Sequence, residues 1–343
     1  MLETIRAFIY SKNLDDSEFD NEYNIFIQQL ESLLQSAFQD IDEKSILTVH
    51  QVLYEINIAH LSVAWFNKAH NIHHPKIVLI KYKIDQAWNK SIQYNYKDQI
   101  QDLPSVDDFP DWIRTTVANH KSNELHPVFT FLRDEANLEQ SKEFFFQETP
   151  LEMLFGDIIA YLLPGIYGGI KVEFVKNYWD EVGRGIDEKV HRKLRARMMK
   201  ALNIDESCYL ENTELFICEE LELINMYLSL ALDRTKHTEL VGALLATELM
   251  IPGRFQYLID GFRRLGFNDY DLHYHIEHTS VDEVHADDLL DHVAMPILKH
   301  DAKQMQALVL GGLRRLDTIH KVLDRLYERV LSNESSYHLV KAA

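Results

Sequence analysis

The sequence has few of the residues that build disulfide scaffolds or turn-rich folds. Its 343 residues include only two cysteines, Cys208 and Cys218, which are too few for a disulfide framework and match no zinc-ligand spacing. Glycine (12) and proline (8) together make up 20 of the 343 residues. This composition argues against low-complexity disorder and against an all-β chain with many tight turns.

Long apolar runs and an excess of basic residues are also missing. The nearest approach to an apolar run, around 154–170, contains Gly156, Asp157 and Pro164, so we expect no transmembrane helix. No basic segment followed by an apolar one opens the chain, so we expect no signal peptide and a cytoplasmic location. The net charge of 35 − 54 = −19 argues against nucleic acid or an anionic membrane surface as a partner.

Helical periodicity dominates the sequence. In the last long segment, apolar residues such as Met305, Leu308 and Leu316 recur at steps of three, four or their multiples, as on one face of a helix. We therefore predict an all-α fold, with residues 1–115 as an N-terminal helical extension and residues 116–343 as a helical bundle. The predicted helices cover 24–38, 45–69, 77–91, 127–147, 150–163, 168–181, 188–202, 214–233, 237–250, 254–265, 270–294 and 302–331.

Histidine is abundant, with 17 residues, and one segment arranges it as metal sites require. His278, Asp282 and His285 follow one another at i, i+4 and i+7 in HTSVDEVH, so at about 100° per residue they share one face of a helix. Two imidazoles and a carboxylate on one stripe favour a metal site. The alternative is a polar helix with stacked histidines.

A second segment, NYWDEVGRGIDEKVH, places Glu181 ten residues before His191. Gly183 and Gly185 separate the two and are expected to end the first helix. Alone this pair is a weak signal, because a solvated carboxylate and a surface histidine also fit it.

The third segment is LVGALLATELMIPGRF, in which Glu248 is the only charge between Val241 and Ile251. A carboxylate in so apolar a helix is costly unless it is paired or bound to a cation. Metal ligation is one solution, and an ion pair with Arg254 or Arg263 is the other.

Together the three segments supply three carboxylates and three imidazoles from several helices. Helical bundles build di-iron carboxylate sites in this way, and this donor set suits Fe, with Mn as the alternative. The six predicted metal ligands are Glu181, His191, Glu248, His278, Asp282 and His285.

In their order and spacing these motifs resemble the haem-oxygenase-like di-iron oxidases and oxygenases, a family of iron-containing redox enzymes. The resemblance covers residues of about 125–335. It implies a seven-helix haem-oxygenase-like bundle that binds two irons, with partial occupancy of the second not unusual, and that uses O₂ to oxidise a small amino-acid-like or fatty-acid-like metabolite. The alternative is a metal-free ligand-binding or scaffold protein of the same fold.

Several points stay open at this level. Whether Glu148 or His275 joins the site is undecided, and the substrate is not specified. Residues 1–115 match no known pattern, and three roles remain for them: to cap the bundle, to bind a partner or to form a homodimer interface.

Overall fold

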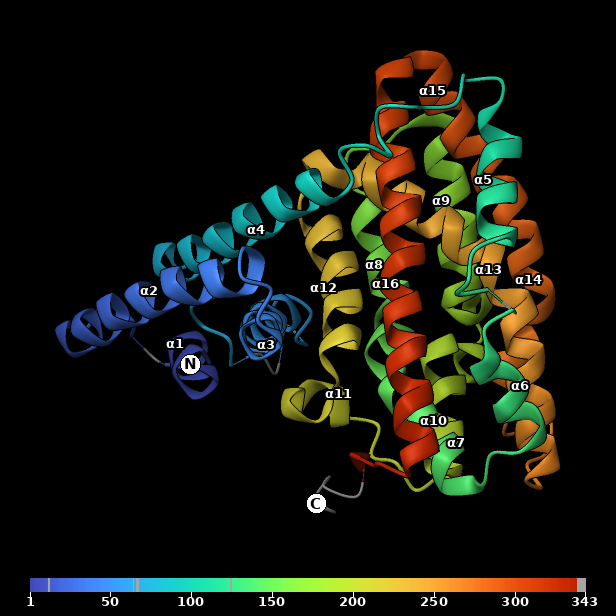
Figure 1. Cartoon of the computed structure of the whole chain (residues 1–343), viewed down its shortest axis with the longest axis horizontal. Helices are drawn as coiled ribbons and strands as arrows, with labels where there is room; N and C mark the ends of the chain where they lie inside the picture. The colour runs from blue at the N-terminus through green and yellow to red at the C-terminus, as the bar shows by residue number, and fades with distance from the viewer. Residues whose placement is uncertain (12, 64, 66–67, 124, 338–343) are drawn as a thin grey trace. The chain divides into compact units, whose positions relative to one another are not determined.

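The computed structural model describes residues 1–11, 13–63, 65, 68–123 and 125–337, without the side chains of residues 18, 252 and 280–284 (Figure 1). Helices and turns account for all regular structure in this part of the chain, and no strand occurs in it. The predicted all-α class is therefore confirmed. None of the described helices is both long enough and apolar enough to cross a membrane.

The chain forms two compact units. The first consists of residues 1–98 together with 216–229, and the second of residues 99–215 and 230–343. The domain boundary predicted between residues 115 and 116 stays a prediction.

In the first unit, α3 packs against α1, α2 and α4. Residues 216–229, which include most of α12, also belong here: the Asn225 side chain donates to the carbonyl oxygen of His50 (2.8 Å) and accepts from the amide of Asn57 (3.0 Å). The helices of this unit are α1 (Leu2–Tyr10), α2 (Ser17–Phe38), α3 (Glu43–Ala59), α4 (Pro75–Asn95) and α12 (Cys218–Leu232).

In the second unit, the long helix α13 packs against α5, α6, α14 and α16, while α8 packs against α9 and α10. Figure 1 shows α13 and α16 side by side along this unit. Its α-helices are α5 (Phe109–Ala118), α6 (Pro127–Asp134), α7 (Leu138–Gln147), α8 (Thr149–Leu162), α9 (Gly168–Glu181), α10 (His191–Ala201), α11 (Cys208–Glu211), α13 (His237–Arg264), α14 (His273–Leu289), α15 (Met295–His300) and α16 (Met305–Ser332).

Short helical turns link several of these helices. A five-residue π-helical turn, η5, directly follows α14, and such turns are frequent near functional sites. The remaining turns are 3₁₀-helical. The short elements are η1 (Gly183–Gly185), η2 (Asp187–Lys189), η3 (Thr213–Leu215), η4 (Arg234–Lys236), η5 (Leu290–Ala294) and η6 (Ala302–Gln304).

Two glycines let α13 and α16 approach closely. A Cβ atom on Gly242 would lie 2.0 Å from the carbonyl oxygen of Leu308, and one on Gly311 would lie 1.9 Å from that of Glu239. Any larger residue at either position would push the two backbones apart. This contact holds α13, which carries Glu248, against the long C-terminal helix.

Several predicted helix boundaries differ from the structure, among them the start of α2, which lies at Ser17 rather than at residue 24. The segment 127–147 divides into α6 and α7, because Asn137 and Gln140 form a capping box that starts a new helix. The segments 237–250 and 254–265 form one helix, α13, which continues through Pro252. The segment 45–69 begins near α3, but this helix ends at Ala59, where the Ser62 hydroxyl donates to the Ala59 carbonyl (2.7 Å).

Candidate metal centre

The predicted ligands lie on four helices of the second unit: α9, α10, α13 and α14. Glu181 is the last residue of α9 and His191 is the first residue of α10, because Gly183 and Gly185 adopt positive φ (66° and 79°) in the turn between them. Only glycine adopts such angles readily. The glycine-rich turn therefore ends α9 at Glu181 and brings the chain back to His191.

Glu181, His191 and His278 form a buried cluster in which one ligand atom from each lies within 4.8 Å of the others. The Nδ1 atom of His191 lies 3.1 Å from Oε1 of Glu181, and the rings of His191 and His278 have centroids 4.5 Å apart. All three residues are at most 9% exposed. The structure thus brings residues from three helices, far apart in sequence, within reach of one ion.

A backbone contact fixes the orientation of His278. Its Nδ1 atom lies 2.7 Å from the carbonyl oxygen of Tyr274, so Nδ1 carries the proton and donates it. This leaves Nε2 as the atom with a free lone pair. Imidazoles that bind metals are commonly oriented by a hydrogen bond of this kind.

Glu248 and His285 form a second pair. Nδ1 of His285 lies 3.7 Å from Oε2 of Glu248, and its Nε2 lies 2.9 Å from Oδ2 of Asp180. The amide of Asn177 donates to Oε1 of Glu248 (3.4 Å). Glu248 is 3% exposed and His285 is 8% exposed. The ion pair with Arg254 or Arg263, the alternative for Glu248 at the sequence level, is not its environment here.

The charges of the site interact strongly. Burial alone would raise the pKa of Glu181, but His191 and then His278 act against this and the pKa is lowered. Burial alone would lower the pKa of His191, yet Glu181 raises it above its usual value. Burial acts the same way on His285, and Glu248 and Asp180 outweigh it and raise its pKa to about 9. The carboxylates thus stabilise positive charge at this place.

Proline shapes the backbone at Glu248. An α-helical carbonyl normally accepts from the N–H of the residue four positions later. For Glu248 that residue is Pro252, which has no N–H. The backbone carbonyl of Glu248 therefore lacks its usual helical hydrogen bond, and the side chain of the same residue belongs to the site.

Two residues near the site were not expected from the sequence. Asp180 and Asn177 lie on α9 one and four residues before Glu181 and contact His285 and Glu248 respectively. Their spacing of three residues on α9 indicates that they share a face of this helix. Their partners are 105 and 71 residues away in the sequence, so the contacts could not be read from the spacing. The predicted ligand Asp282 has a side chain outside the described residues, and its role stays a prediction.

Other buried charged residues of the second unit pair with one another or with the backbone. Arg254 pairs with Glu148, and both are at most 3% exposed; burial raises the pKa of Glu148 while Arg254 opposes this. Arg195 is fully buried and donates to the carbonyl of Phe145 (2.9 Å). Glu148 is thus engaged by an arginine rather than by the two ligand groups.

His275 is fully buried, and neither of its ring nitrogens has a hydrogen-bond partner in the part of the chain that is described. Burial and then the charge of Arg195 lower its pKa well below the usual value. His275 is therefore a neutral imidazole packed among aromatic rings, with Phe255 at a centroid distance of 4.9 Å.

A pocket adjoins the ligand groups. Its lining combines ligand side chains with apolar ones, and the hydroxyl of Tyr274, which also lines it, donates to Glu152. Burial and Glu152 raise the pKa of Tyr274 well above its usual value, so it keeps its proton. The pocket is lined by Leu151, Glu152, Phe155, Glu181, Thr247, Glu248, Ile251, Tyr274 and His278.

The donor set fits iron. Carboxylate oxygens and imidazole nitrogens without thiolates suit Fe or Mn, and the two cysteines, Cys208 and Cys218, are not among the residues of either cluster that the structure forms in its described part. Buried carboxylates beside oriented imidazoles require a cation or protons to balance their charge.

Comparison with known proteins agrees with this chemistry. No curated protein matches the chain. The model of the iron-containing redox enzyme family matches residues 142–320, which is 179 of the 343 residues and includes every predicted ligand. The chain therefore belongs to the family of iron-containing redox enzymes, and its role is an iron-dependent redox one.

Proposed function

We propose that this protein is a non-haem di-iron oxidase or oxygenase that uses O₂ to oxidise a small organic metabolite. One observation carries the proposal: two adjacent buried groups, Glu181–His191–His278 and Glu248–His285, each combine carboxylate with imidazole. Glu181 and His278 of the first group line the same cavity as Glu248 of the second, which supports one continuous centre rather than two separate ones.

In this proposal each group holds one iron. Glu181, His191 and His278 bind the first ion, and Glu248 and His285 bind the second, with Asp282 added from its spacing in the sequence. Six protein ligands leave coordination positions open on two ions, and the irons supply the redox chemistry and the site of O₂ binding.

The remaining residues of the site hold the ligand imidazoles in the orientation that binds metal. The Tyr274 carbonyl holds His278 in the tautomer that binds metal, and Asp180 takes the same part for His285. Before His285 can bind a metal it must lose one proton, which its raised pKa opposes. Metal affinity should therefore rise as the pH rises towards about 9.

The substrate is expected beside Glu181 and Glu248, where the cavity as it stands holds about one water molecule and must widen for a substrate to bind. Leu151, Phe155 and Ile251 contribute apolar lining, and the Tyr274–Glu152 pair contributes a hydrogen-bonding group. This lining supports a small substrate with an apolar body and one polar group.

Anaerobic Fe(II) titration of the metal-free chain tests the proposal. We expect uptake of about two Fe(II) per chain, as in di-iron bundles, and a sharp reduction in His285→Ala. His292→Ala is the matched control, because His292 is 59% exposed and lies on η5, just beyond the same helix. Equal uptake by His285→Ala and the wild type would rule out the assignment.

The reaction with O₂ is a second test. When the Fe(II)-loaded protein is mixed with O₂, we expect a transient visible absorption whose decay is accelerated by the substrate. If iron does not bind and no absorption forms, a metal-free ligand-binding protein of the same fold becomes the better description.

A further inference from the structure

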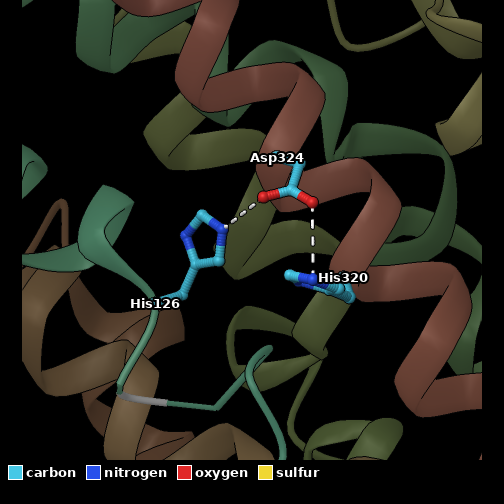
Figure 2. Close-up of side chains that lie close together, drawn as sticks. All are labelled: His126, His320 and Asp324. Carbon is cyan, nitrogen blue, oxygen red and sulfur yellow. Dashed lines mark hydrogen bonds and ion pairs between the residues drawn. The ribbon is translucent and has the colours of Figure 1, made fainter.

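A second cluster of metal-binding side chains lies apart from the centre described above. Figure 2 shows His126, His320 and Asp324, with the carboxylate of Asp324 between the two imidazoles. Oδ1 of Asp324 lies 3.2 Å from Nε2 of His126, and Oδ2 lies 3.4 Å from Nε2 of His320. One ligand atom from each residue lies within 4.8 Å of the others.

The cluster joins two segments of the second unit. His320 and Asp324 are one turn apart on α16, so they face the same side. His126 precedes α6, almost 200 residues earlier in the chain, with a separation of 198 from Asp324. The side chain of His126 is 3% exposed and that of Asp324 is 59% exposed, so solvent reaches the cluster at Asp324.

We infer that His126, His320 and Asp324 form a second metal site, which takes Zn²⁺ or a similar borderline divalent cation independently of the iron centre. Two imidazole nitrogens, one carboxylate oxygen and one water complete the tetrahedral shell that Zn²⁺ prefers. The inference does not rest on the proposed function, because none of these residues belongs to the iron centre.

Two further side chains with metal-binding atoms, those of His120 and Asp317, lie next to the cluster. His120 lies on the other side of His320, with ring centroids 5.9 Å apart, and its Nε2 is 3.4 Å from Oδ1 of Asp317. One face of α16 therefore carries Asp317, His320 and Asp324. This face contacts His120 and His126, which precede α6. Nδ1 of His320 is buried and has no hydrogen-bond partner among the described residues. His120 and Asp317 thus lie beside the cluster, but the group whose ligand atoms all lie within 4.8 Å of one another consists of His126, His320 and Asp324.

The hydrogen-bonding state of His126 sets a condition for binding. Its Nδ1 accepts from the N–H of Val128 (3.2 Å) and caps α6, so Nε2 carries the proton and donates to Asp324. Zn²⁺ at Nε2 requires this proton to move to Nδ1, which breaks the cap. Binding therefore weakens the start of α6 locally while it ties His126 to α16.

The chain contains its own control for this arrangement. His74 also precedes a proline, caps α4 through Nδ1 and contacts an aspartate, Asp15, at 2.9 Å through Nε2. No second imidazole completes a metal-binding group there within the described residues. If His126 were only a capping residue, it would behave like His74.

The test is a Zn²⁺ titration of the metal-free, full-length protein in competition with a chromogenic chelator. We expect His278→Gln to keep the Zn²⁺ ion of the second site, and His320→Gln to lose it with a decrease in affinity of about 100-fold or more. Asp324→Asn should show the same loss, and this exposed substitution leaves the fold intact. His74→Gln should bind as the wild type does.

Co²⁺ gives an independent readout, because a tetrahedral Co²⁺ ion absorbs strongly in the visible range. We expect this absorption in the His278→Gln background and its loss when His320→Gln is added. Equal Zn²⁺ binding by the wild type, His320→Gln and Asp324→Asn would overturn the inference. The cluster would then be a set of hydrogen bonds that connects the start of α6 to α16.

Discussion

Two clusters in this chain each bring together two imidazoles and one carboxylate, but they differ in burial. Glu181, His191 and His278 are all buried, whereas in the other cluster His126 is buried, His320 is partly exposed and Asp324 is exposed. The first cluster adjoins a second carboxylate–imidazole pair and a pocket. The other one connects the start of α6 to α16.

The difference shows how burial changes the charge balance that two imidazoles and a carboxylate need. A solvated carboxylate costs little without a partner, but a buried one must be neutralised by a cation, a proton or an arginine. Glu148 has an arginine, while the partners of Glu181 and Glu248 among the described side chains are imidazoles and an amide. Burial therefore favours a redox metal centre at the first cluster, and partial exposure favours a binding site with a structural role at the second.

Removal of a buried ligand should have the largest effect. In His278→Ala we expect iron content to fall to half or less of the wild-type value and O₂-dependent activity to fall to background, because the oriented Nε2 ligand is lost. Iron analysis and oxygen-consumption assays measure this. His273→Ala, on the same helix with a side chain that is 40% exposed, should retain both.

A buried ion pair should matter far more to stability than an exposed one. Arg254→Met leaves Glu148 buried without its partner, and we expect a loss of about 3–5 kcal/mol in the free energy of unfolding. Arg114→Met removes a partner of Asp287 whose side chain is 65% exposed, and it should cost less than about 1 kcal/mol. Similar losses in chemical denaturation of the two variants would contradict the role given to burial.

Loss of the hydrogen bond from His285 to Asp180 should weaken metal binding without abolishing it. We expect Asp180→Asn to weaken iron binding by about 10–100-fold, because the amide holds the ring less firmly than the carboxylate at 2.9 Å. Asp187→Asn, with a side chain 72% exposed near the same turn, should bind iron as the wild type does. Competition with an iron chelator measures both.

The pH dependence of stability should have opposite signs at His285, which lies beside the first cluster, and at His126 of the second. The pKa of His285 is raised to about 9, so in metal-free protein its contribution is complete below pH 6.5 and is lost as the pH rises through about 9. Burial lowers the pKa of His126, so its contribution is present above pH 6.5 and is lost as the pH falls below that value.

Thermal unfolding of metal-free variants from pH 5 to about 10 checks these signs. We expect His285→Gln to flatten the decrease on the alkaline side and His126→Asn, which keeps a capping residue before α6, to flatten the decrease on the acid side. An unchanged profile in either variant would mean that another group controls that part of the curve.

Much of the fold could be predicted from the sequence, because its signals are local. The helical periodicity near 168–181 matches α9 at both ends, and the glycines after Glu181 predicted the end of that helix. The capping box at Asn137 was present in the sequence, but helical patterns on both sides of it predicted one continuous helix. The family, confirmed by the match over residues 142–320, was predicted from three short motifs in order.

The partners of the site residues could not be predicted in the same way. Asp180 next to Glu181 looks like an ordinary helix-end carboxylate, and only the fold shows that it reaches His285 across 105 residues. The same is true of Glu148 and Arg254, which are 106 residues apart. Such pairings depend on how the helices pack, and periodicity in the sequence does not specify it.

The most direct test is anomalous diffraction at the iron absorption edge from crystals grown anaerobically with Fe(II). The account predicts two adjacent peaks, one beside Glu181, His191 and His278 and the other beside Glu248 and His285. A single peak, or peaks at His126 and His320 with none at the buried groups, would contradict the central claim that this protein carries a di-iron centre.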